Sequence, residues 1–160
     1  MITDKQKQLV NDFYETLNET NEKLIFNEII DFLLELGYKP IKCKTSDFCL
    51  DFYHSKLKQK IVKIRRNELK LKFYACEEYS MKFSNAIKSV IEEFNGKYTG
   101  CYGCGKCKGS LRGYTYIYPN GRKVFRCGSE LIAIPDIIQE DLDEIKQLIN
   151  VQHEFFISMF

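Results

Sequence analysis

A cluster of cysteines in the second half of the chain is the feature that most restricts its fold. Cys101, Cys104 and Cys107 follow one another at two-residue intervals, and Cys127 comes after a segment typical of a β-hairpin. Two-residue gaps allow one turn of backbone to direct neighbouring sulfurs at a common centre, and a hairpin returns a fourth sulfur to them. The spacing therefore predicts a tetrahedral metal site with these four cysteines as ligands.

The overall composition is that of an ordinary globular domain. The chain has 160 residues, of which 44% are hydrophobic and 29% charged, and one domain typically has about 100–200 residues. The formal net charge of +2 is too small to indicate a protein that coats nucleic acid. The seven cysteines form an odd number, and a clustered set without a secretion signal favours metal binding over disulfides.

The hydropathy pattern predicts a cytoplasmic protein. Residues 1–8 are polar, and the apolar core of a signal peptide does not follow them. We find no apolar run that approaches the roughly 20 residues needed to cross a bilayer. We therefore expect no membrane partner.

Helical periodicity appears at the start, in the middle and at the end of the chain. Thr3 and Gln6 can form a capping box before a first helix, and a second helix is expected to end at Gly37. A central helix is predicted over about residues 77–95. A last helix is predicted to follow Pro135 and to continue nearly to the C-terminus.

Apolar and charged residues alternate between these helices, which predicts strands. Short antiparallel strands are expected in the first half of the chain at 41–45, 48–54, 62–65 and 69–73. The adjacent apolar residues Ile61 and Val62 predict a β-bulge. Residues 114–127 are expected to form a hairpin around an Asn-Gly turn, and 131–134 one more strand.

These elements predict an α+β fold. We expect an antiparallel meander packed with N-terminal, central and C-terminal helices, together with a cysteine-rich metal loop and hairpin. Residues 1–160 are expected to form a single domain, with 98–128 as the metal-binding loop and hairpin inside it.

Part of this segment resembles a known kind of metal site. The sequence Cys-x2-Cys-Gly-Lys at 101–106 resembles a zinc knuckle of the zinc-ribbon kind, and Phe-Arg-Cys-Gly at 125–128 resembles the end of a ribbon's second half. The resemblance covers about residues 101–128, and Cys107 and Cys127 replace the second Cys-x2-Cys pair of a ribbon. It implies a structural zinc ion, with the glycine after the second cysteine at positive φ.

An iron–sulfur cluster is the alternative cofactor for the same four cysteines. Three cysteines at two-residue spacing plus a remote fourth also hold a [4Fe–4S] cluster. However, Cys127 is followed by glycine rather than proline, and Lys106, Lys108 and Arg126 lie beside the ligands, where they would offset the −2 charge of a zinc tetrathiolate. We therefore favour zinc, and a closed shell of four thiolates favours a structural role.

Other residues give weaker indications of chemistry. His54 and His153 lack the spacing of a metal-hydrolase motif, so no catalytic residue and no site for an organic cofactor are predicted. Cys76 precedes the central helix and is expected to be a plain buried cysteine. The basic segment 56–72 could contact phosphates, but its charges alternate as on the solvated face of a sheet, so a nucleic-acid partner is not favoured.

The sequence thus predicts a small cytoplasmic metal-binding protein, a non-enzymatic binding or interaction module. The rival hypotheses are an iron–sulfur electron-transfer or sensor protein, and an enzyme whose site the sequence does not reveal. The partner could be a protein, a nucleic acid or a small molecule. Apolar residues at the end of the last helix, including Phe156 and Phe160, could bury in the chain's own core or form a homodimer.

Overall fold

The structure, a computed structural model, describes residues 2–93, 100–107 and 109–160. Its helices are α1 (Asp4–Glu15), α2 (Thr20–Glu35), α3 (Met81–Glu92) and α4 (Leu142–Ser158), with a short 3-10 helix at Gln139–Asp141. Its strands are β1 (Lys39–Lys42), β2 (Cys49–His54), β3 (Gln59–Arg65), β4 (Glu68–Leu71), β5 (Gly113–Ile117), β6 (Lys123–Cys127) and β7 (Ile132–Ile134).

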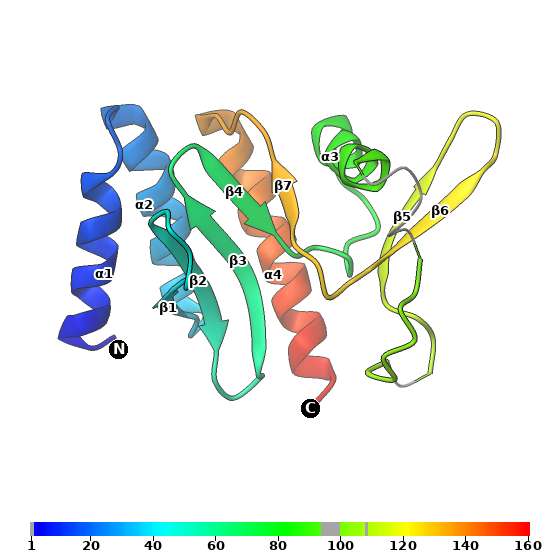
Figure 1. The fold of residues 1–160 in the computed structure, drawn as a ribbon, viewed down its shortest axis with the longest axis horizontal. Coiled ribbons are helices and arrows are strands. Elements are labelled where there is room, and N and C mark those ends of the chain that lie inside the picture. Colours follow the sequence, from blue (N-terminus) through cyan, green and yellow to red (C-terminus); the bar gives the residue numbers. More distant parts are fainter. Residues whose placement is uncertain (1, 94–99, 108) are drawn as a thin grey trace.

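The strands that the structure describes form a five-stranded sheet and a separate hairpin (Figure 1). The sheet has the order β1-β2-β3-β4-β7, and every neighbouring pair is antiparallel. Strands β5 and β6 pair with each other and form the predicted hairpin around Asn120-Gly121. The predicted α+β fold with a meander is therefore confirmed.

The predicted β-bulge lies in β3. Phe52 pairs with Val62, but the next residue, Tyr53, pairs with Lys60, so Ile61 is the extra residue. Ile61 and Val62 are both fully buried. The bulge allows two consecutive apolar side chains to reach the core, which a regular strand would place on opposite faces.

Helices α1, α2 and α4 cover one face of the sheet, and α3 packs beside β7 and the hairpin (Figure 1). The covered face supplies fully buried side chains that include Leu50, Phe52, Ile64, Leu69 and Leu71. Its helical partners include Phe13, Ile29, Leu33, Ile149 and Phe156. The opposite face carries the charged residues of the alternating pattern, which explains why the period-two segments became strands of one sheet.

The helix ends follow local signals, with one difference. Thr3 and Gln6 form the predicted capping box, and Gly37 follows α2 with φ of 91°. Helix α3 begins at Met81, later than the predicted residue 77, because Ser80 is an extended N-cap and Tyr79 packs on Phe73 at 5.4 Å. The predicted end of this helix at Asn95-Gly96 lies outside the described residues.

Both histidines of the chain meet at Tyr38. His54 ends β2 and His153 lies in α4, and their ring centres are 5.9 Å apart. The Tyr38 hydroxyl and Nδ1 of His153 are hydrogen-bonded at 3.1 Å, and the Leu57 N–H donates to Nδ1 of His54 at 3.2 Å. The pair therefore belongs to the contact between β2 and α4.

Burial lowers the pKa of both histidines below the ordinary value. At His54 the positive charge of Lys56 lowers the pKa further. At His153 the charge of Glu154 raises the pKa and that of His54 lowers it, without overcoming burial. The folded chain thus favours two neutral imidazoles.

The apolar end of α4 divides between core and surface. Phe156 is fully buried, whereas 77% of Phe160 is exposed. Phe155 packs edge-on against Tyr74 at 5.6 Å, and Phe156 also contacts Tyr74 at 6.4 Å. Phe156 is therefore part of the chain's own core, whereas Phe160 is exposed. Within residues 2–93, 100–107 and 109–160, no helix combines the length and apolarity that crossing a bilayer requires.

Acidification should destabilise the fold through the two histidines. Because their folded pKa is lowered, the unfolded chain binds protons first, so the free energy of unfolding should fall as pH decreases below about 6.5. In His54→Gln/His153→Gln this fall should be smaller between about pH 5 and 6.5. Urea unfolding at each pH measures it, and equal slopes in both proteins would contradict the prediction.

Phe156 and Phe160 should differ sharply in their contribution to stability. We expect Phe156→Ala to lower the free energy of unfolding by about 3–5 kcal/mol, because it leaves a cavity in the core. Phe160→Ala should change it by no more than about 0.5 kcal/mol. Light scattering of Phe160→Glu beside the natural chain then tests the homodimer, since this variant should remain folded.

Candidate metal centre

The hairpin brings the predicted metal loop back to its fourth cysteine. Gly113 in β5 pairs with Cys127 at the end of β6, and Gly100 forms a parallel bridge with Arg126. The loop that starts at residue 101 therefore lies next to β6, the strand that ends at Cys127. This topology agrees with the prediction that a hairpin would return Cys127 to the loop.

All four predicted ligands line one cavity of about 260 Å³. Cys101, Cys104, Cys107 and Cys127 are free thiols there, and residues 98, 99 and 108 of the predicted segment lie outside the described residues. In a tetrahedral zinc site with Zn–S bonds of about 2.3 Å, sulfurs lie roughly 3.8 Å apart. No three of these sulfurs lie within 4.8 Å of one another, so a metal ion would have to draw the loop together.

The loop backbone carries features suited to thiolate ligands. Gly105, after the second cysteine, has the predicted positive φ, 74°, and Gly103 has φ of 66°. The Gly103 N–H donates to the sulfur of Cys101 at 3.3 Å. The Ser129 hydroxyl lies 3.2 Å from the sulfur of Cys127. Donors of this kind stabilise the charge of a metal-bound thiolate.

Two basic side chains line the cavity, and a third, Arg126, precedes Cys127 in β6. Lys106 and Arg112 line it directly. Arg126 is only 3% exposed, is ion-paired with Glu130, and donates to the Val90 carbonyl of α3 at 2.9 Å. The arginine therefore fixes the strand beside Cys127 to the body of the fold.

Lys72 departs from the sequence interpretation, which placed it on the solvated face of the sheet. It is 7% exposed, and its ammonium lies over the Phe156 ring at 5.9 Å. Burial lowers the pKa of Lys72 to about 8, with a contribution from Lys60, and the charge of Cys127 opposes this. The lysine follows the last residue of β4, where the alternation of the strand no longer decides exposure.

A second group of possible ligands lies in the sheet. The ligand atoms of Cys43, Cys49 and Asp51 all lie within 4.8 Å of one another, which makes this group, among the described residues, one that could hold a metal ion. Burial raises the pKa of the Cys43 thiol to about 12, and a hydrogen bond with Cys49 and the charge of Asp51 add to this.

Sequence reasoning did not predict this group. Cys49 and Asp51 lie two residues apart on β2 and share a face, and the connection between β1 and β2 places Cys43 beside them. Cys43 and Cys49 lay in two neighbouring predicted strands, which was the available signal, but their pairing depended on the strand register.

The other residues considered for chemistry are engaged elsewhere. The Cys76 thiol donates to the Leu148 carbonyl at 3.5 Å, and burial raises its pKa to about 11. Neither histidine lines the cavity of the four cysteines. Four of the eight cations of segment 56–72 pair with two carboxylates. Lys60 and Lys63 contact Asp51, and Arg65 and Lys70 contact Glu68.

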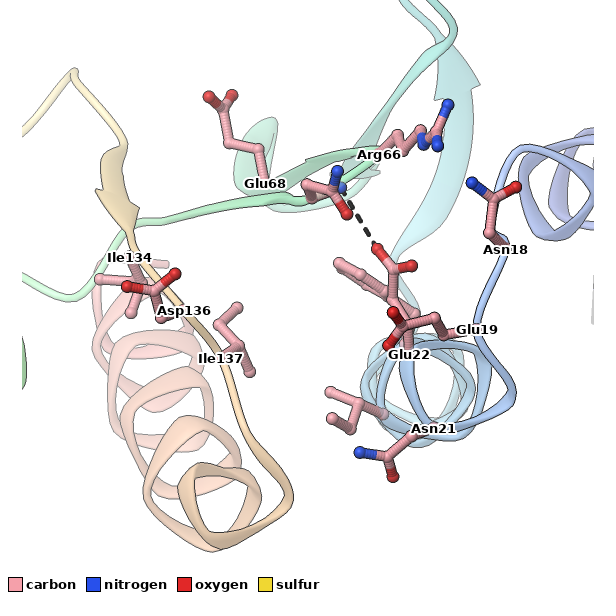
Figure 2. A pocket seen from close by; sticks show the side chains of 12 residues that line it. Asn18, Glu19, Asn21, Glu22, Arg66, Glu68, Ile134, Asp136 and Ile137 are labelled. Atoms are coloured by element: carbon pink, nitrogen blue, oxygen red, sulfur yellow. Dashed lines mark hydrogen bonds between the residues drawn. The ribbon is translucent and has the colours of Figure 1, made fainter.

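A polar cleft with a volume of about 370 Å³ lies between the start of α2, the β3–β4 turn and the segment after β7 (Figure 2). Glu19 and Glu22 lie on its α2 side, and Asp136 lies opposite (Figure 2). Glu22 accepts the Asn67 N–H at 3.3 Å, and Glu68 is ion-paired with Arg65. Two of the carboxylates that line the cleft, Glu22 and Glu68, therefore already have partners within the fold.

Comparison with known proteins does not supply a family for this arrangement. No protein-family model, no curated protein and no solved structure matches the chain.

Proposed function

We propose that the chain binds one structural zinc ion through Cys101, Cys104, Cys107 and Cys127 and acts as a non-enzymatic binding or interaction module in the cytoplasm. The observation that carries the proposal is that these four sulfurs, from two ends of a hairpin segment, line one cavity. Four thiolates complete a tetrahedral shell and leave no position for a substrate.

The zinc ion would order a segment that has little core of its own. Between residues 100 and 113 the described side chains are exposed or half-buried, and several glycines have positive φ. By contrast, Tyr114, the next residue, is 2% exposed and packs on Phe73. The hairpin is thus anchored at its base, and the loop depends on its ligands. Coupled metal binding can supply about 10 kcal/mol to such a loop.

The surface favours a protein partner over nucleic acid. Leu111 and Ile117, on the loop and hairpin, are 58% and 62% exposed, so a protein partner could contact them. Four of the eight cations of segment 56–72 form ion pairs with Asp51 or Glu68. An iron–sulfur cluster on the same four cysteines remains the alternative, with electron transfer or sensing as its function.

Metal analysis tests the identity of the ion. Protein purified anaerobically without added metal should contain one zinc ion per chain held by the four cysteines, and Cys104→Ser should lose it. Cys76→Ser is the matched control, because its thiol lies outside the cavity. A brown protein containing iron and labile sulfide would establish the alternative instead.

Removal of the metal should loosen the loop and hairpin while the sheet and helices persist. The physical reason is that the main core contains none of the four cysteines. Hydrogen exchange after chelation should therefore rise over 100–127 and change little in α2 and β3. Loss of most helical circular dichroism on chelation would show that zinc holds the whole fold.

A further inference from the structure

Cys43 and Cys49 lie opposite each other at one end of the sheet. Lys42 in β1 pairs with Leu50 in β2, and one residue further the Cys43 N–H donates to the Cys49 carbonyl at 2.9 Å. Asp51 is two residues beyond Cys49 on the same strand, so its side chain lies on the same face. The register therefore brings two sulfurs and a carboxylate together on the face that the helices do not cover.

The group is partly enclosed and has an unused acceptor. Cys49 is fully buried, whereas Cys43 and Asp51 are half-buried. Oδ1 of Asp51 is buried and has no hydrogen-bond partner in the described part of the chain, although the Lys63 ammonium lies 3.8 Å away. A buried carboxylate oxygen without a hydrogen bond is costly, and a metal ion would satisfy it.

Three cations border the same group. Lys60 donates to Oδ2 of Asp51 at 3.0 Å, and Lys63 faces Oδ1. Arg65 approaches the sulfur of Cys49 at 4.0 Å. Of the two carboxylate oxygens of Asp51, Oδ1 is the one left without a hydrogen bond.

We propose that Cys43, Cys49 and Asp51 form a second metal site, for a thiophilic divalent ion such as Zn²⁺. Two thiol protons leave as one divalent ion enters, so the net charge of the group does not change on binding. Tetrahedral zinc places two sulfur ligands roughly 3.8 Å apart, and the atoms already lie within 4.8 Å of one another. Only small movements are required.

The donor set leaves one coordination position open. Two sulfurs and one oxygen make three protein ligands, and zinc with three protein ligands takes a water or another ligand in the fourth position. This site would therefore differ from the closed four-cysteine centre, and it does not depend on that centre. Since Cys43 is the more exposed of the two thiols, the open position would be on its side, toward solvent.

Cadmium titration of the reduced, metal-free 160-residue chain tests the proposal. The natural chain should bind two Cd²⁺ ions, with cadmium NMR signals of a tetrathiolate and of a mixed sulfur–oxygen site. Cys43→Ser should lose only the mixed signal. Asp51→Asn should lower the affinity of the mixed site for Cd²⁺ by about tenfold or more. Binding to the mixed site should release about two protons per ion.

Controls separate this site from the proposed zinc centre. Cys104→Ser should lose the tetrathiolate signal and retain the mixed one, and Cys76→Ser should retain both. If Cys43→Ser and Asp51→Asn bind Cd²⁺ as the natural chain does, the second site is wrong and the four-cysteine proposal stands. If Cys104→Ser binds Cd²⁺ as the natural chain does while Cys43→Ser and Asp51→Asn do not, the four-cysteine proposal is wrong and the second site stands. Finding Cys43 and Cys49 joined as a disulfide in protein purified anaerobically would also overturn the second site.

Discussion

The packing of α4 against the covered face of the sheet is the contact that connects most parts of this structure. Ile145, Ile149 and Phe156 are fully buried there. The same helix fixes the segment between β4 and α3, because Gln152 accepts the Ala75 N–H at 2.8 Å and the Leu148 carbonyl accepts the Cys76 thiol. The helix therefore supplies both apolar burial and hydrogen bonds to a stretch of chain that has no regular structure.

The hairpin depends on this core through one aromatic residue and one cation. The Tyr114 hydroxyl accepts the Phe73 N–H at 3.3 Å and donates to the Glu130 carbonyl at 2.9 Å. Arg126 connects β6 to α3 through the Val90 carbonyl. Both residues lie at the base of the hairpin, beside the loop of the four cysteines. The base is thus held by the core, and a metal ion would stabilise the part that the core does not reach.

The two groups of cysteines differ in how far the fold prepares them. Cys43 directly follows β1 and Cys49 begins β2, and a backbone hydrogen bond between the two residues holds them in place. The loop cysteines are held instead by turns, with local donors such as Gly103 and Ser129. Ligands on a rigid sheet lose less conformational entropy on binding a metal than ligands on a loop. In the two proposed sites, the loop would compensate with four thiolates, whereas the sheet would offer three ligands.

The sequence by itself determined the local elements: the capping box at Thr3, the strand alternation, the bulge at Ile61 and the hairpin before Cys127. Each depends on neighbours a few residues apart, so periodicity and turn residues were sufficient. Tertiary structure alone decided that Lys72 is buried, that His54 and His153 meet at Tyr38, and that Cys43 and Cys49 stand beside Asp51. Those outcomes depend on strand register and on helix packing between distant segments, which local patterns do not specify.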